Sequence, residues 1–343
     1  MVELNGKKIL VTFLMHLGDL TLTTPFIHAL RKAAPDAHIT MLVDEKLKDV
    51  VLFNPYLDEV VTIDKKGRDN SILSLWACSR HLSKLDFDVL INLHPNERCS
   101  FIDAMTSVKL RTGTTHKIFK WFWDVFTPLD RSMHAADMYL DVLQQLGVQD
   151  LSNNGLEIFP GEEHFLEAEL FWQEQNITDQ DKLIGFNIGS AVPTKRWPPE
   201  RFAEVADIFA AKGYKTVFFG GPMDEEMVAE ATGYMQTRPI IATGHFAIGG
   251  LAAAMRRCCL IITNDSGPMH VAISQKVPIV AMYGPSNPKL YGPYTKDAVI
   301  VTAQPPCQGC ADGMKHSCDD LQCMSRMTVE QVVAAADTIM LNK

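Results

Sequence analysis

The sequence lacks the two glycine-rich signatures by which many nucleotide-binding proteins are recognised. It contains no G-x-G-x-x-G and no G-x-x-x-x-G-K-[ST] segment, so hydride-transfer and P-loop functions lose their main support. It also lacks an apolar run of about 18 residues, the length that crosses a bilayer. Lys7 and Lys8 precede the first apolar segment, where a signal peptide would have its apolar core. We therefore expect a cytoplasmic protein.

An excess of positive charge is also absent. The chain has 32 Lys and Arg against 41 Asp and Glu, which gives a formal net charge of −9. No nucleic-acid partner is expected, because no long basic stripe interrupts this acidic average. With 343 residues, of which 47% are hydrophobic, the chain can bury two cores of ordinary domain size.

Two successive sets of alternating strand and helix patterns predict two α/β domains with parallel sheets. In the first set, strands are expected near residues 8–14, 38–43, 59–63, 87–92 and 108–112, and helices near 22–34, 45–53, 71–84, 97–106 and 134–147. In the second set, strands are expected near residues 183–187, 215–219, 239–241, 259–263, 278–282 and 298–302, with a last helix at about 328–341. The polar segment 150–161 is the natural linker.

The segment from Ile261 to His270 joins an apolar strand to a turn of small polar residues and a new helical pattern. Ser266 or Gly267 can cap that helix, and free amides at a helix N-terminus attract anions such as a diphosphate. His270 would lie on the first turn, where imidazole can donate to a phosphate or sugar oxygen. An ordinary capped turn is an equally weighted alternative, because capping signals recur in every α/β protein.

A second strand, near residues 183–187, is followed by a loop that contains Ser190, Thr194, Lys195 and Arg196. The two cations can neutralise a diphosphate, and the hydroxyls and backbone amides can share its hydrogen bonds. Adjacent basic residues are more often a solvated surface.

A third strand ends in Gly220-Gly221, which admits a close backbone approach. Glu225 and Glu226 follow, and a carboxylate there can accept hydrogen bonds from ribose hydroxyls. The alternative is that these carboxylates only stabilise the dipole of the next helix.

The first strand, near residues 8–14, is followed by Gly18-Asp19. In open α/β sheets ligands bind outside the carboxyl ends of the strands, so Asp19 is a candidate general base. The alternative is an N-cap for the helix that starts near Thr24.

These segments, with Pro193 to Trp197 and Gly284-Pro285-Ser286-Asn287-Pro288 in the same order, resemble the family 9 glycosyltransferases, the ADP-heptose:lipopolysaccharide heptosyltransferases. The resemblance implies the α/β fold called GT-B, in which two Rossmann-like, doubly wound parallel-sheet domains face each other across a cleft. It implies an acceptor-binding domain at 1–155, a donor-binding domain at 160–325, and a C-terminal helix at 326–343 that packs back on the N-terminal domain.

The same resemblance implies an inverting transfer of heptose from ADP-heptose to a lipopolysaccharide inner-core acceptor. Asp19 would remove the acceptor proton, and Lys195 with the helix N-terminus would stabilise the leaving ADP. No cofactor is required in that scheme, because neither Asp265 nor Asp319-Asp320 forms the D-x-D arrangement of a metal-dependent transferase. The implied donor-binding residues are Ser190, Thr194, Lys195, Gly221, Glu225, Ala242, Thr243, Asp265, Ser266, Gly267 and His270.

A basic and aromatic stretch from Arg111 to Trp123 is the candidate site for the acceptor. Its cations can meet phosphates or carboxylates, and its aromatic side chains can stack on sugars or lie against the cytoplasmic face of the inner membrane as a peripheral contact. Burial of those aromatic residues in the core is the favoured alternative. The candidate acceptor-binding residues are Arg111, Lys117, Lys120 and His134.

Four cysteines, Cys307, Cys310, Cys318 and Cys323, form a C-x2-C-x7-C-x4-C cluster near the C-terminus. Four thiols this close can bind a structural zinc ion or an iron–sulfur cluster. The spacing is not that of a standard zinc ribbon. Reduced thiols are the alternative, because the cytoplasm is a reducing compartment.

Two other functions stay open at this point. The same fold can serve a transferase or an epimerase that acts on a different nucleotide sugar. The chain can also be a non-catalytic nucleotide-sugar-binding protein with a metal-loaded cysteine loop. The joint presence of Asp19, Lys195 and His270 favours an active enzyme.

Overall fold

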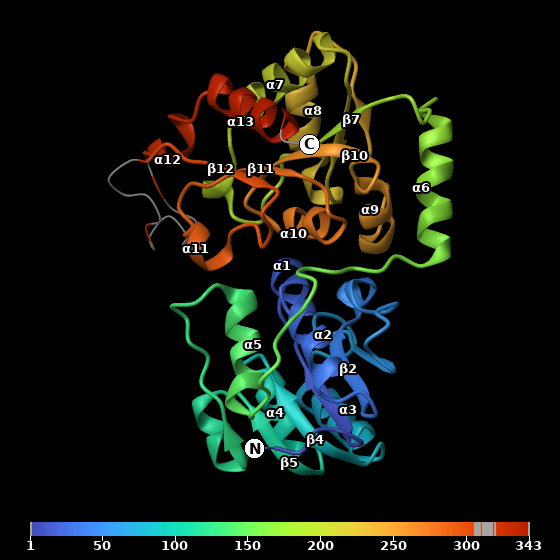
Figure 1. Ribbon diagram of the computed structural model, residues 1–343, viewed down its shortest axis with the longest axis vertical. Coiled ribbons are helices and arrows are strands. Elements are labelled where there is room, and N and C mark those ends of the chain that lie inside the picture. The colour runs from blue at the N-terminus through green and yellow to red at the C-terminus, as the bar shows by residue number, and fades with distance from the viewer. Residues whose placement is uncertain (1, 305–309, 311–317, 319, 342–343) are drawn as a thin grey trace. The chain divides into compact units, whose positions relative to one another are not determined.

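The computed structural model describes residues 2–304, 310, 318 and 320–341. It divides into two compact units, Met1–Phe159 and Pro160–Lys343, drawn from blue to green and from green to red in Figure 1. The boundary falls inside the segment 150–161 that the sequence predicts as a linker.

The N-terminal unit is built on a parallel six-stranded sheet in the order β3-β2-β1-β4-β5-β6. Its strands are β1 (Lys8–Thr12), β2 (His38–Asp44), β3 (Glu59–Ile63), β4 (Phe87–Asn92), β5 (Val108–Gly113) and β6 (Val125–Phe126). Its helices are α1 (Leu17–Thr21), α2 (Thr24–Ala33), α3 (Ile72–Ser83), α4 (Glu97–Met105) and α5 (Ala135–Gln145), with the 3₁₀ helices η1 (Glu45–Val50) and η2 (Lys117–Phe122).

The C-terminal unit repeats this plan with the order β12-β11-β10-β7-β8-β9, again all parallel. Its strands are β7 (Leu183–Asn187), β8 (Lys215–Phe219), β9 (Ile240–Ile241), β10 (Cys258–Asn264), β11 (Ile279–Met282) and β12 (Ala298–Val301). Its helices are α6 (Glu162–Glu174), α7 (Pro199–Ala211), α8 (Glu225–Tyr234), α9 (Ile248–Met255), α10 (Gly267–Ser274), α11 (Pro288–Tyr291), α12 (Gln322–Ser325) and α13 (Val329–Leu341), with the 3₁₀ helices η3 (Pro193–Lys195) and η4 (Pro222–Asp224).

Each sheet has the strand order of a doubly wound Rossmann-like domain, and this confirms the predicted fold class. The first strand of each unit lies beside the fourth, so the order reverses between β1 and β4 and again between β7 and β10. At such a switch point the connections leave toward opposite faces of the sheet and open a crevice at the carboxyl ends of the two strands. The fold therefore points to two ligand-binding edges, one in each unit.

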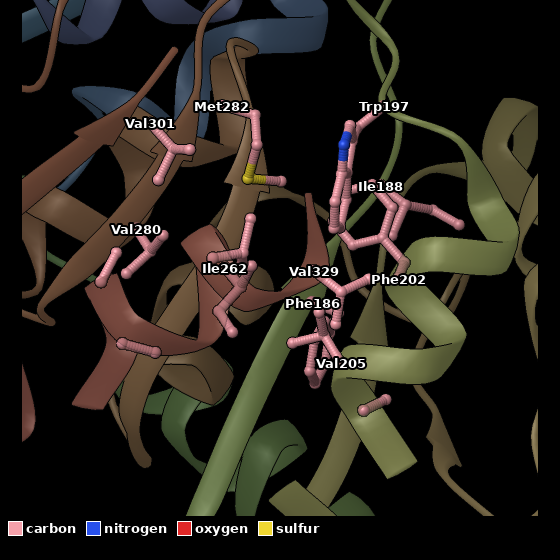
Figure 2. Close-up of a cluster of buried hydrophobic side chains, with 14 of the residues drawn as sticks. Phe186, Ile188, Trp197, Phe202, Val205, Ile262, Val280, Met282, Val301 and Val329 are labelled. Atoms are coloured by element: carbon pink, nitrogen blue, oxygen red, sulfur yellow. The ribbon is translucent and has the colours of Figure 1, made fainter. Parts of the chain in front are cut away.

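The core of the C-terminal unit explains why its strands read as continuous apolar runs. Strands of a parallel sheet are covered on both faces and need no polar side. Figure 2 shows Phe186 of β7 and Ile262 of β10 in one cluster with Trp197 and Phe202 from the start of α7. All four side chains are fully buried, so the loop that carries Trp197 is anchored to the sheet.

The last helix, α13, packs into the core of the C-terminal unit, and its packing on the N-terminal domain stays a prediction. Val329, Val332 and Ala336 of α13 are buried in the same cluster as the β7 and β10 side chains. The helix contacts α7 and the strands β10 to β12. Its apolar face therefore completes the core of the domain that carries it.

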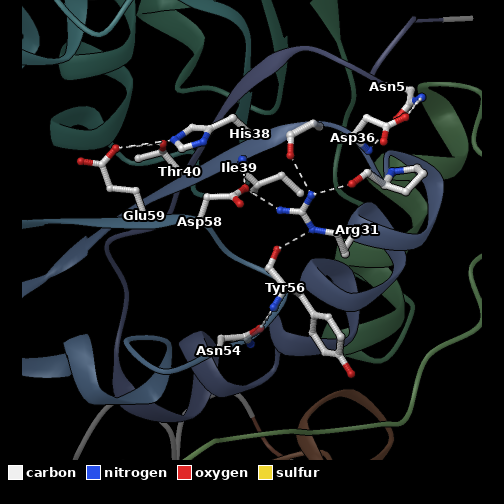
Figure 3. A network of polar contacts seen from close by, with 12 residues as sticks. Asn5, Arg31, Asp36, His38, Ile39, Thr40, Asn54, Tyr56, Asp58 and Glu59 are labelled. Atoms are coloured by element: carbon white, nitrogen blue, oxygen red, sulfur yellow. Dashed lines mark hydrogen bonds and ion pairs between the residues drawn. The ribbon is translucent and has the colours of Figure 1, made fainter.

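A polar network fixes α2 to the loop before β3, as Figure 3 shows. The guanidinium of Arg31 donates to Asp58 Oδ2 at 2.6 Å, to the Ala37 carbonyl at 2.7 Å and to the Tyr56 carbonyl at 3.1 Å. The Ile39 amide donates to the same carboxylate oxygen at 2.7 Å. The planar fork of arginine suits such multiple bonding, and it holds β2 and β3 in place beside β1.

Candidate functional site

The candidate donor site lies at the switch point of the C-terminal unit. The loops after β7 and β10 begin at Ile188 and Asp265, and the two strands are neighbours in the sheet. This edge gathers Ser190, Lys195, Asp265, Ser266 and Gly267, which the sequence analysis selected from segments more than 60 residues apart.

Lys195 and Asp265 form an ion pair at the centre of this site. Lys195 Nζ lies 2.7 Å from Asp265 Oδ2, and the two side chains are only 14% and 7% exposed. Ser286 Oγ donates to the same carboxylate oxygen at 2.5 Å. A buried charge is stable when it is paired and hydrogen-bonded, so the ion pair fixes the position of the Lys195 ammonium group in the loop after β7.

The turn before α10 differs from the expected capping arrangement. Ser266 is the N-cap residue, but its side chain makes no capping hydrogen bond. Ser266 Oγ instead accepts from Asn187 Nδ2 at 2.8 Å, and the same amide group donates to Thr263 Oγ1 at 3.1 Å. Because the Ser266 hydroxyl is bonded to Asn187, it does not cap the first backbone amides of α10. A helix start without a side-chain cap is a suitable place for an anion.

The second cation of the loop has a structural contact. Arg196 Nε donates to the Ser190 carbonyl at 2.8 Å, and Ser190 Oγ donates to the Asp265 carbonyl at 3.4 Å. Trp197 is completely buried, and its backbone amide donates to Asn264 Oδ1 at 3.0 Å. These contacts fix both ends of the loop, and Thr194 within η3 is buried.

A second group of predicted residues lies at the carboxyl ends of β8 and β9. Asp224 Oδ2 accepts from the Gly221 amide at 2.9 Å. A Cβ placed on Gly189 would lie 2.2 Å from Asp224 Oδ1, so the loop after β7 touches this carboxylate directly. A Cβ on Gly244, which has φ +75°, would lie 2.7 Å from Glu225 Oε1. The backbone of the loops after β7 and β9 therefore lies in close contact with the carboxylates of Asp224 and Glu225.

Three further predicted donor residues, Ala242, Thr243 and His270, also lie at this edge, and two of them are buried. Thr243 Oγ1 donates to the Phe218 carbonyl at 3.2 Å. Ala242 is 1% exposed at the end of β9, and His270 is 4% exposed on α10. Their positions follow the strand ends as expected, although Ala242 and His270 are mostly covered by protein.

The N-terminal unit carries a pocket of about 870 Å³ at its own switch point. Every lining residue follows the carboxyl end of a strand: 14–16 after β1, 65, 66 and 70 after β3, 94 and 96–98 after β4, and 116 after β5. The lining carries Lys65, Lys66 and Arg98 with a single carboxylate, Glu97. This excess of cations and imidazoles suits an anionic, hydroxyl-rich ligand.

Lys65 positions the loop that follows β1. Its ammonium group donates to the Leu14 carbonyl at 2.7 Å and to the Met15 carbonyl at 3.1 Å. It also lies 3.1 Å from Asp44 Oδ2. Three acceptors satisfy the three donors of an ammonium group, so Lys65 holds the pocket wall in place.

A neutral histidine forms the floor of this pocket. Burial, together with the charges of Lys65 and His16, lowers the pKa of His94 to about 4. His94 is 6% exposed, and its ring lies 5.6 Å from that of Phe13. An uncharged imidazole can donate one hydrogen bond and accept another, so His94 adds polarity to the pocket without adding charge at neutral pH.

Asp19 lies in the first turn of α1, directly after the pocket-lining residues 14–16. It is half-buried. The N-cap of α2 is Thr23, so Asp19 does not have the capping role considered as its alternative.

The four predicted acceptor-binding residues do not line the pocket. Arg111 Nε donates to the Asp103 carbonyl at 3.1 Å, and its Nη2 donates to the Thr106 carbonyl at 2.5 Å, so this guanidinium caps the end of α4. His134 Nδ1 accepts from the Ala136 amide at the start of α5. Lys117 and Lys120 lie on η2, beside the pocket residue His116. The expected burial of the aromatic residues holds for Trp123, whereas Trp121 is 95% exposed.

The cysteine cluster is only partly described. Cys307 lies outside the described residues. Cys318 Sγ accepts from the Leu321 amide at 3.5 Å, and Cys323 is buried in the core of the C-terminal unit. Among the residues that the structure describes, no three side chains able to bind a metal converge. A metal in this loop stays a prediction.

Several site residues were missed from the sequence: Asn187, Asp224, Ser286, Lys65, His94, Arg98 and His116. Asn187 ends a predicted strand, and His94 follows another by two residues. That position, at the carboxyl end of one of the two strands at a switch point, is the signal that could have found both.

None of the helices in the described part of the chain is both long and apolar enough to cross a bilayer. That finding concerns the helices alone.

Known proteins resemble this chain in sequence and in fold. The model of the family described as "Glycosyltransferase family 9 (heptosyltransferase)" matches residues 75–318. Lipopolysaccharide heptosyltransferase 3 of Escherichia coli K12 is 24% identical over 297 residues, which cover 82% of this chain and 84% of that protein.

Two solved structures are similar over their whole length. A family 9 glycosyl transferase from Veillonella parvula DSM 2008 is 53% identical, with coverage of 100% of this chain and 99% of that chain and a TM-score of 0.95. E. coli ADP-heptose lps heptosyltransferase II is 21% identical, with coverage of 98% and 99% and a TM-score of 0.81. The second likeness shows the fold.

Proposed function

The chain belongs to glycosyltransferase family 9, the heptosyltransferases, and from this we propose that it transfers heptose from ADP-heptose to an acceptor in the inner core of lipopolysaccharide. ADP-heptose is named for one structural relative and lipopolysaccharide for a sequence relative. The two strand-end sites, one in each unit, supply places for an anionic donor and an anionic acceptor.

The observation that carries the donor assignment is the buried pair of Lys195 with Asp265 beside the start of α10. We infer that the diphosphate binds where the ammonium group, the Ser190 hydroxyl and the first amides of α10 meet. Charge-assisted hydrogen bonds of this kind stabilise a leaving diphosphate more strongly than neutral ones. Glu225, beside the turn after β9, is suited to accept the ribose hydroxyls.

The acceptor is proposed to occupy the N-terminal pocket. Lys66 and Arg98 would meet its phosphates or carboxylates, and the imidazoles of His94 and His116 would meet its hydroxyls. Asp19 follows the pocket wall and would remove the proton of the attacking hydroxyl. Attack on the anomeric carbon from the face opposite the diphosphate inverts the configuration. In this scheme charge on the leaving ADP is stabilised by Lys195 and the helix start, without a divalent metal.

Calorimetric titration with ADP, UDP and GDP tests the donor site. We expect ADP to bind best, and we expect Lys195→Ala to weaken ADP binding by about tenfold to a hundredfold, because it removes a charge-assisted contact and leaves Asp265 buried without its cation. Binding that survives in the variant would remove the diphosphate from this loop. A preference for UDP or GDP would keep the family and change the donor.

Lys212→Ala is the matched control. Lys212 also forms an ion pair at 2.7 Å in the C-terminal unit, with Asp337, but both side chains are about 40% exposed. An exposed pair contributes little, so ADP affinity should stay at the wild-type value in this variant.

A further inference from the structure

The most exposed large apolar side chains of the N-terminal unit form two groups. Ile72, Leu73 and Trp76 form the α3 patch, with Leu73 78% exposed. Ile118, Trp121 and Phe122 form the η2 patch, with Trp121 95% exposed. Isolated exposed apolar residues are ordinary, but such side chains gathered on one turn mark an interaction surface.

Both patches adjoin the N-terminal pocket. Asn70 lines the pocket two residues before the α3 patch, and His116 lines it two residues before the η2 patch. The start of α4 ties the two sides together. Arg98 Nη2 donates to Asn70 Oδ1 at 2.7 Å, and Ser100 Oγ accepts from the His116 amide at 2.9 Å. The patches therefore belong to the rim of the pocket.

The same rim is locally basic in a chain whose net charge is −9. Residues 71–83 and 114–123 contain no Asp or Glu and hold three cations, Arg80, Lys117 and Lys120. Lys120 Nζ lies 4.4 Å from the centroid of the Phe126 ring, and the Arg80 guanidinium lies 6.0 Å from that of Trp76. Exposed aromatic and aliphatic side chains interleaved with cations are the composition of surfaces that bind anionic bilayers.

We propose that the α3 and η2 patches dock the rim of the N-terminal pocket onto an anionic lipid bilayer. This inference rests on the proposed function, since a glycolipid acceptor keeps its acyl chains in the bilayer while its sugars enter the pocket. Apolar side chains of the rim enter the headgroup region, and Arg80, Lys117 and Lys120 meet the lipid phosphates. The enzyme then works at the surface that holds its acceptor.

A third exposed apolar stripe provides the contrast. Leu166 and Leu170 of α6 are 60% and 51% exposed, but the helix carries Glu162, Glu163 and Glu169 and no Lys or Arg. Acidic side chains repel anionic headgroups. The α6 stripe therefore exposes apolar side chains as the α3 and η2 patches do, but the charged side chains around it are acidic.

The test is flotation of the full chain with phosphatidylcholine vesicles, with and without phosphatidylglycerol, in the absence of nucleotide and acceptor. Wild type should float with the anionic vesicles. Leu73→Ser with Trp76→Ser, and separately Ile118→Ser with Trp121→Ser, should lower the partition coefficient about tenfold or more. Lys117→Gln with Lys120→Gln should lower it by about fivefold per lysine, on anionic vesicles only.

Leu166→Ser with Leu170→Ser is the control pair and should float as wild type does. The proposal is overturned if wild type does not bind anionic vesicles, or if the control pair loses as much binding as the rim variants. It is also overturned if the η2 patch variants abolish a concentration-dependent dimer and leave vesicle binding unchanged, which would assign the face to a second copy of the chain.

An activity measurement separates this proposal from the proposed function. The apolar rim variants should transfer heptose to a delipidated acceptor at the wild-type rate and to a vesicle-embedded acceptor more slowly. If wild type binds vesicles but transfers heptose to neither acceptor, the proposed function fails and the docking surface stands.

Discussion

Asp103 is a buried carboxyl group that the proposed reaction does not use. It is completely buried on α4, where Thr12 Oγ1 donates to its Oδ2 at 2.8 Å. Burial raises its pKa to about 8, although the hydrogen bonds from Thr12 and Cys99 act in the opposite direction. At neutral pH the folded protein therefore keeps a proton that the unfolded chain releases.

The sign of the resulting pH dependence follows from proton linkage. The carboxyl ionises near 3.8 in the unfolded chain and near 8 in the folded protein, so the folded state binds more protons between these values. The contribution of this carboxyl group to the free energy of unfolding is complete below about pH 3.8 and is lost as the pH rises to about 8. Asp103→Asn removes the titration, and its melting temperature should rise relative to wild type by roughly 10 °C or more between pH 4 and pH 8.

Thermal unfolding of both proteins across this pH range measures the effect. Asp130→Asn is the control, because hydrogen bonds from Ser132 lower the pKa of this exposed carboxyl. Its difference from wild type should stay constant above about pH 5. A constant difference for Asp103→Asn as well would show that Asp103 is ionised in the folded protein.

The loop after β7 has room only for a glycine at position 189. A Cβ on Gly189 would lie 2.2 Å from Asp224 Oδ1 and 2.4 Å from its Cγ. Gly189→Ala should therefore lower the free energy of unfolding by about 1–3 kcal/mol through overpacking, and it should weaken ADP binding because the loop with Ser190 and Lys195 must move. Denaturant unfolding and calorimetric titration measure the two effects.

Gly233→Ala is the matched control, since a Cβ there meets no heavy atom within 4 Å. Gly233 lies inside α8, where alanine is favoured over glycine by up to about 1 kcal/mol. Adding Asp224→Ala to Gly189→Ala should recover part of the loss, because the clashing carboxylate is gone. If the double variant is as unstable as the two single losses combined, the contact is not the cause.

Much of the element order could be predicted, because strands buried on both faces are apolar runs that stop at small polar residues. The segments 183–187 and 215–219 were predicted with the bounds that β7 and β8 have. Helix α6 was missed because its exposed side chains include Phe165, Leu166 and Leu170, which leave no clean polar face. The segment predicted as a helix at 45–53 is the shorter 3₁₀ helix η1.

The candidate donor loops could be found because each is continuous in sequence and follows a strand. The N-terminal pocket could not, because it combines single residues from four loops whose neighbourhood depends on strand order. The pairing of Lys195 with Asp265 across 70 residues has the same origin. The sequence instead predicted the acceptor site at 111–123, where basic and aromatic residues lie close together. Arg111, however, caps the end of α4.

At the scale of the whole molecule, each unit has its own sheet and core. We expect two calorimetric unfolding transitions, because a domain with its own core unfolds as a unit. ADP at about 100 times its dissociation constant should stabilise the C-terminal unit by about 2.7 kcal/mol and leave the other transition unchanged.

Lys195→Ala and Gly189→Ala identify which transition is which. The first should reduce the shift with ADP to about half or less, and the second should lower the midpoint of the same transition without ligand. One cooperative transition that ADP moves as a whole would show instead that the two units unfold together.

The contact between Lys65 and the loop after β1 has a consequence for how such an enzyme diverges. Lys65 donates to the carbonyl groups of Leu14 and Met15 and to no side chain of the loop. Because every residue type offers the same carbonyl, mutation at positions 14 to 16 changes the pocket lining without removing the bonds that hold its path. In the proposed reaction, one acceptor can thus replace another during evolution while Asp19 keeps its place.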